Sequence, residues 1–94
     1  MAPLEEYLKQ ADYLAQEIVN AWAINVQAGI GADLTDEFKG VFDRACRYRD
    51  SKSLADNHRE CNFLSERDAA EESDTRQAFA EAYKTFWEKR EAAA

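Results

Sequence analysis

Residues that form tight turns are scarce in this chain. Its 94 residues include three glycines and one proline, and the proline is at position 3. Tight hairpins depend on glycine, proline and asparagine, so a fold built from many short strands is not expected. Alanine, glutamate and long basic side chains, which favour helices, are abundant instead. The sequence predicts an all-α fold: one domain, residues 1–94, forming a small irregular bundle of three to four helices with long first and last helices.

Apolar residues recur every three or four positions from Leu4 to Val26, which is the spacing of one helical face. Pro3 suits a first helical position, and Gly29 suits the position that follows a helix. We therefore expect one helix of about 25 residues, about 38 Å long. Its inward face is expected to comprise Leu4, Tyr7, Leu8, Ala11, Leu14, Ala15, Ile18, Trp22 and Val26.

The second half of this segment carries no charge from Ile18 to Ala32. Tyr13 and Ile24 project from the face opposite the apolar one. A second copy of the chain would cover such a face in a homodimer, which is one hypothesis. The other is that both are single exposed apolar residues, as is common on soluble proteins. The uncharged run is too short and too polar to span a bilayer, so no membrane contact is expected.

Turn signals divide the middle of the chain. The stretch GIGADLTDE, residues 29–37, indicates a loop, and Thr35 is expected to cap a second helix that runs to about Arg49. Gly40 lies inside that helix and either weakens it or marks the close approach of another backbone. A serine at position 51 or 53 is expected to cap a third helix. The inward residues are expected to be Phe38, Val41, Phe42, Ala45 and Cys46, then Leu54, His58, Cys61 and Leu64.

The last third of the chain begins with another cap. Ser65 is expected to cap a helix that has Asp68 at its third position. Residues 66–77 are polar nearly all round and predict either a solvated helix, in one version continuous with the third, or a linker that ends at Ser73. The last helix is defined by an aromatic stripe: Phe79, Tyr83, Phe86 and Trp87. Residues 92–94 are expected to be a disordered or vector-derived tail.

The net charge of −7 is unevenly distributed. Residues 1–37 carry seven acidic residues and one lysine, residues 38–64 carry six basic and four acidic residues, and residues 65–94 carry eight acidic and five basic residues. Acidic ends of this kind repel free duplex DNA, because duplex binding needs a net basic face. They attract basic partners, or they serve solubility alone.

Two surfaces are candidates for partner binding. The acidic face comprises Glu66, Asp68, Glu71, Glu72 and Asp74. The basic waist, within residues 44–59, comprises Arg44, Arg47, Tyr48, Arg49 and Lys52, with Tyr48 placed to stack on a base or a guanidinium. The favoured function is a protein–protein interaction module with a basic protein partner. It would act as an inhibitor, regulator or adaptor, a type common among phage-encoded inhibitors and toxin-immunity proteins. The alternative is a small subunit of a nucleoprotein complex that contacts RNA or DNA through the basic waist.

The stretch CRYRDSKSLADNHREC, residues 46–61, contains both cysteines and the only histidine. It offers too few ligands for structural zinc and has no Cys-x-x-Cys pair for redox chemistry. A disulfide between Cys46 and Cys61 is conceivable only if two helices form a hairpin here, and a His58–Cys61 dyad leaves little room for a substrate. We interpret the stretch as an elbow between two helices, with both thiols in the core.

Recognised catalytic and cofactor motifs are missing. The chain has no Gly-x-Gly-x-x-Gly, Walker, His-Glu-x-x-His or Gly-x-Ser-x-Gly sequence. We therefore expect no enzyme, no cofactor, and no catalytic, cofactor-binding or metal-binding residues. Two cysteines without a recognisable leader predict a cytoplasmic protein with free thiols.

Overall fold

The described part of the chain is helical. The computed structural model describes residues 3–27 and 36–93. Its helices are α1 (Leu4–Lys9), α2 (Ala11–Gln27), α3 (Asp36–Glu60) and α4 (Glu66–Ala93). No strand occurs within these residues, which confirms the all-α class. Outside this description lie residues 28–35, with Gly29 and Thr35, and the side chains of Trp22, Ile24, Val26 and Phe38.

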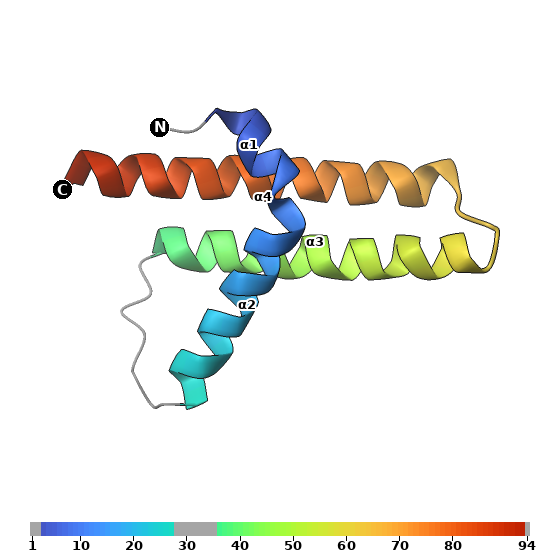
Figure 1. The fold of residues 1–94 in the computed structure, drawn as a ribbon, viewed down its shortest axis with the longest axis horizontal. Coiled ribbons are helices and arrows are strands. Elements are labelled where there is room, and N and C mark those ends of the chain that lie inside the picture. The colour runs from blue at the N-terminus through green and yellow to red at the C-terminus, as the bar shows by residue number, and fades with distance from the viewer. Residues whose placement is uncertain (1–2, 28–35, 94) are drawn as a thin grey trace.

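Helices α3 and α4 run antiparallel to each other, and α1 and α2 lie across them (Figure 1). α1 contacts α4, whereas α2 contacts both α3 and α4. The molecule measures 18 Å along its shortest axis and 47 Å along its longest. A helix with its side chains is about 10 Å across, so the shortest dimension corresponds to two layers of helices. This arrangement confirms the predicted irregular bundle.

One hydrophobic core fills the crossing between the two layers. Its buried members are Ala11, Leu14, Ala15 and Ile18 of α2, Val41, Ala45 and Tyr48 of α3, and Phe79 of α4. The ring of Phe79 stacks on that of Tyr48, with 6.2 Å between the ring centroids and 16° between the ring planes. None of the described residues 56–78 is buried, so the far end of the α3–α4 pair extends beyond this core.

The predicted first helix is divided at Gln10. This residue has φ −99° and ψ 8°, outside the helical range, and the chain changes direction between α1 and α2 (Figure 1). In a continuous helix the carbonyl oxygen of Leu8 would accept a hydrogen bond from the amide of Asp12. Here it accepts two from the guanidinium of Arg76 in α4, at 3.1 and 2.6 Å. The Leu8 carbonyl also accepts a backbone N–H at the end of α1, so α4 adds a tertiary contact at the point where this short helix ends.

Helix α3 passes without interruption through the break expected near Ser51. No glycine or proline occurs in residues 41–65, so nothing in the segment is a strong helix breaker. An ion pair between Lys52 and Asp56, at 3.2 Å and i, i+4 spacing, also supports the helix there. The predicted elbow was therefore wrong: residues 46–60 are the second half of one helix.

Because α3 is continuous, its buried face keeps one phase along its length. The buried residues are Val41, Ala45, Tyr48 and Ala55. The prediction of a new helix after Ser51 or Ser53 placed Leu54 on the inward face. In the structure the next residue, Ala55, is buried instead, and Leu54 is 44% exposed. Cys61 is exposed as well, so the prediction of two core thiols was wrong for this residue.

A Schellman motif ends α3. Asn62 adopts the left-handed conformation, with φ 61°, and its amide donates to the carbonyl of Arg59 at 3.1 Å. The amide of Phe63 donates to the carbonyl of His58 at 3.0 Å, and their rings lie 4.7 Å apart between centroids. This pairing of a ring contact with two backbone bonds is the usual form of the motif. The turn after α3 is therefore held by these two backbone hydrogen bonds and the ring contact.

Ser65 caps α4, as the sequence predicted. Its hydroxyl oxygen accepts a hydrogen bond from the amide of Asp68 at 3.1 Å. From Glu66 the helix continues to Ala93, so residues 66–77 are helical and the linker alternative was wrong. The predicted long last helix is confirmed.

Candidate protein-binding surfaces

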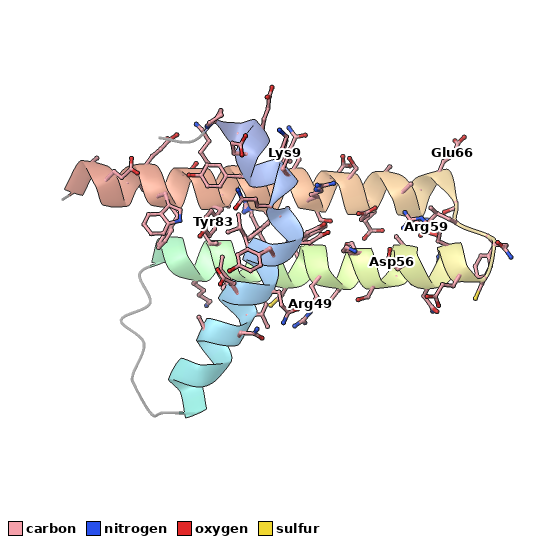
Figure 2. The ribbon with its side chains drawn as sticks, in the orientation of Figure 1. Lys9, Arg49, Asp56, Arg59, Glu66 and Tyr83 are labelled. Carbon is pink, nitrogen blue, oxygen red and sulfur yellow. The ribbon has the colours of Figure 1, made fainter. Side chains whose placement is uncertain are left out.

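The five residues of the predicted acidic face point in two directions. Glu66, Glu71 and Asp74 are exposed and make no ion pair within the described residues. Figure 2 shows Glu66 at the start of α4, directed away from α3. Asp68 and Glu72 instead face α3, with side chains only 18% and 20% exposed. The structure thus leaves three members of this face accessible to a partner.

Asp68 and Glu72 join α4 to α3. The Oδ2 atom of Asp68 lies 2.7 Å from Nδ1 of His58 and accepts a hydrogen bond from the Ser65 hydroxyl at 2.9 Å. These hydrogen bonds, the one with His58 first, lower the pKa of Asp68 below its ordinary value of 3.8. The carboxylate of Glu72 lies 3.8 Å from the guanidinium of Arg59, which reaches from α3 towards α4 (Figure 2).

One exposed acid on the same side of α4 was missed. Glu81 lies seven positions after Asp74, which is two helical turns, and accepts a hydrogen bond from Gln77 at 3.2 Å. The heptad spacing of acids was the signal that could have revealed it. We define the acidic row of α4 as Glu66, Glu71, Asp74 and Glu81. Between residues 66 and 81 one cation, Arg67, is exposed on the same side, so this stretch of the surface carries a net charge of −3.

Tyr48 does not belong to the surface of the basic waist. It is 1% exposed, its ring stacks on Phe79, and its hydroxyl donates a hydrogen bond to Asp12 of α2. Burial, followed by that hydrogen bond, raises the pKa of Tyr48 far above its ordinary value of 10.0. The expected stacking of Tyr48 on a base or a guanidinium was therefore wrong.

Two further residues of the basic waist are neutralised by acids. Nζ of Lys52 lies 3.2 Å from Asp56 and 3.9 Å from Asp12, and Arg49 pairs with its neighbour Asp50 at 3.2 Å. Arg49, Lys52 and both of the lysine's partners line a polar pocket of about 260 Å³ between α2 and α3. Because acids and bases alternate around it, this pocket offers no net charge to a ligand.

Arg44 and Arg47 are the part of the basic waist that stays exposed without an ion pair in the described structure. They lie one helical turn apart on α3 and face the edge of α4. Together with Asp74 and Thr75 they line a shallow depression of about 260 Å³. The waist is thus reduced to two arginines beside one carboxylate.

The two cysteines are free and far apart. Because the helix is continuous between them, Cys46 and Cys61 are separated by about 22 Å, several times the span of a disulfide. Burial raises the pKa of the half-buried Cys46 thiol, whereas Cys61 is exposed. Within the described residues, no three histidine, cysteine or carboxylate side chains gather as metal ligands would.

The face of α2 opposite its apolar side, where Tyr13 and Ile24 were expected, is described only in part. Tyr13 is 62% exposed, and its hydroxyl donates a hydrogen bond to Glu17 at 2.6 Å. The amide of Gln16 donates to Asn20 at 2.9 Å. Both hydrogen bonds join side chains of α2 itself. A homodimer that uses this face stays a prediction.

Two exposed surfaces of opposite charge therefore remain as candidates: the acidic row of α4, and the pair Arg44 and Arg47. Among the helices of residues 3–27 and 36–93, none combines the length and apolar character that a bilayer crossing requires. No protein-family model, curated protein or solved structure matches the chain.

Proposed function

We propose that this chain is a protein–protein interaction module that binds a basic partner through the acidic row of α4, as an inhibitor, regulator or adaptor. The distribution of paired and unpaired charges over the described residues supports this proposal. Five of the described cations are paired with acids within the chain, whereas the four acids of the row make no ion pair there. The neutralising pairs are Lys9–Glu6, Arg49–Asp50, Lys52–Asp56, Arg59–Glu72 and Lys84–Glu88.

Uncompensated carboxylates on a rigid helix act on a partner mainly before contact. They create a negative potential that steers a basic surface into encounter and raises the association rate. Because the row is exposed, this attraction is screened over about 8 Å at physiological ionic strength. Binding should therefore weaken as salt concentration rises.

The nucleic-acid hypothesis has less support. Tyr48 is buried, and Arg49 and Lys52 are paired with acids, so only two arginines of the basic waist are without an ion pair in the described structure. Duplex and single-strand binding normally require several cations along a backbone, with aromatic rings exposed for stacking. Both cysteines are free thiols, which supports the cytoplasm as the proposed location.

The test is a tagged pull-down from native lysate, with and without nuclease, comparing the wild-type chain with Glu71→Lys/Asp74→Lys. We expect a stoichiometric protein partner that survives nuclease and is lost with this variant. The matched control is Asp43→Lys/Glu60→Lys, which changes net charge equally at exposed positions of α3. It should keep the partner.

Three results would contradict the proposal. Equal loss of the partner in both variants would show that net charge alone matters. Retention in both variants would show that the acidic row is not the binding surface. Loss of all partners on nuclease treatment, together with loss in Arg44→Glu/Arg47→Glu, would assign binding to the basic waist instead.

A further inference from the structure

A second pocket lies where α1 crosses the C-terminal half of α4. It has a volume of about 300 Å³, and three aromatic rings line it: Tyr7 of α1, and Tyr83 and Trp87 of α4. The buried side chain of Leu14 lines it as well. Figure 2 shows Tyr83 on the side of α4 that faces the other helices. The pocket is separate from the acidic row, which occupies the solvent-facing side of the same helix.

The three rings are mutually inclined. The Tyr7 and Tyr83 centroids are 5.5 Å apart with 59° between the ring planes, and the Tyr83 and Trp87 centroids are 6.2 Å apart at 64°. Inclined rings present π faces in more than one direction. The face of an aromatic ring carries negative charge density, and a cation within about 6 Å of its centroid is attracted to it.

Two carboxylates and the side chain of Gln10 complete the lining of the pocket. Glu6 enters from α1 and Glu91 from α4. Glu6 has one exposed contact, with Lys9 at 3.8 Å, and Glu91 has no ion pair among the described side chains. The pKa of Tyr7 is raised first by burial and next by the negative charge of Glu91, with a smaller opposing effect of Lys84.

We propose that this pocket binds the cationic end of an arginine or lysine side chain of a partner protein. Aromatic rings and carboxylates together favour an organic cation on an alkyl chain: the rings take the chain and one face of the cation, and the carboxylates balance its charge. A neutral apolar side chain would leave the charges of both carboxylates unbalanced, and an anion would be repelled by them. The partner is the basic protein of the proposed function, on which this inference rests for its occupant.

The experiment titrates the full-length chain with N-acetyl-arginine amide and follows the indole Nε1–H resonance of Trp87 by NMR. The Trp87→Phe spectrum distinguishes it from Trp22. We expect a saturable shift in the millimolar range, and a similar one with N-acetyl-lysine amide. N-acetyl-citrulline amide, which has nearly the same shape without the charge, should give no saturable shift.

Two variants identify the contributing groups. Trp87→Leu keeps apolar bulk but removes the ring face, and should weaken arginine amide binding about fivefold. For this variant the shifts are followed at backbone amides of α1. Glu91→Gln should weaken binding and reduce its salt dependence, whereas Glu81→Gln, on the acidic row, should not change it.

Equal shifts with citrulline amide would overturn the inference, as would a titration without saturation or an unchanged affinity in both pocket variants. Its failure is distinguishable from failure of the proposed function. The titration uses no partner and reports on the pocket alone, whereas the pull-down with Glu71→Lys/Asp74→Lys leaves the pocket intact.

Discussion

The Tyr48 hydroxyl donates a hydrogen bond to the carboxylate of Asp12, a residue 36 positions away in the sequence. It links the buried face of α3 to the start of α2 and, through the stacking of Tyr48 on Phe79, to α4 as well. A single side chain thus contacts all three of the long helices.

Replacing Tyr48 by Phe should keep the ring packing and remove this bond. We expect a loss of about 1.5 kcal/mol in the free energy of unfolding, at the lower end for a bond to a charged group, because the carboxylate of Asp12 remains accessible to water. Tyr48→Ala should cost about 3 to 5 kcal/mol, since it also leaves a cavity. Urea denaturation measures both. A Phe variant as stable as the wild type would show that the hydrogen bond contributes nothing net.

Arg76→Lys should loosen α1. Lysine keeps the charge but cannot reproduce the two-pronged contact of the guanidinium with the Leu8 carbonyl. We expect a loss of about 1 to 2 kcal/mol in stability and faster amide hydrogen exchange in Leu4–Lys9 than in the rest of the chain. Arg67→Lys, at an exposed position of α4, is the control. Unchanged exchange in α1 would mean that this contact does not hold it.

Asp68→Asn should alter the acid limb of the stability curve. The pKa of Asp68 is lowered in the folded state by His58 and Ser65, so its contribution is present above pH 3.8 and lost as pH falls through the lower folded value. Because asparagine does not titrate, the variant lacks this part of the loss of stability as pH falls. The urea midpoint of Asp68→Asn should therefore be lower than that of the wild type at neutral pH, and the two midpoints should converge at acidic pH. Asp74→Asn, at an exposed unpaired carboxylate, should not show this convergence.

The two thiols should react at different rates with a disulfide reagent. Cys61 is exposed and should be modified quickly, whereas burial and a raised pKa slow Cys46. Cys61→Ser should remove the fast phase. Mild oxidation should give disulfide-linked dimers and no internal disulfide, which non-reducing mass spectrometry distinguishes. An internal Cys46–Cys61 bond would require α3 to be broken and would contradict the structure.

Gly40→Ala should stabilise α3 by about 1 kcal/mol. A Cβ atom built at this position meets no described atom within 4 Å, so the close backbone approach that would require glycine is not seen there. Ser53→Ala, at an exposed position of the same helix, should give about half this gain. Thermal or urea unfolding tests both. Destabilisation by Gly40→Ala would indicate that a part of the chain outside the described residues packs against it.

Local pattern was enough to predict the helical class, the Ser65 cap and the inward face of α2 from Ala11 to Ile18. It failed at Ser51 because a serine between charged residues looks like a cap, although the stripe Val41, Ala45 and Tyr48 continues to Ala55 in helical phase. Following that stripe would have predicted both the continuous helix and the burial of Tyr48.

Tertiary contacts explain the rest. The break at Gln10 lies beside the contact of Arg76 with the Leu8 carbonyl, and the direction in which Asp68 and Glu72 point depends on how α4 is rotated against α3. The aromatic pocket combines Tyr7 with Tyr83, which only the crossing of α1 over α4 brings together. No local sequence pattern carries information about such crossings.

The turn between α3 and α4 also bears on how the chain folds. Only residues 61–65 separate the two helices, and the motif at Asn62 and the Ser65 cap fix the direction of return. Closing so short a loop costs little entropy, so contacts between α3 and α4 can form early. Helix α1 must instead reach α4 across a much longer separation in sequence, as in the contact of Tyr7 with Tyr83. We therefore expect the α3–α4 pair to nucleate folding and α1 to dock in a later step.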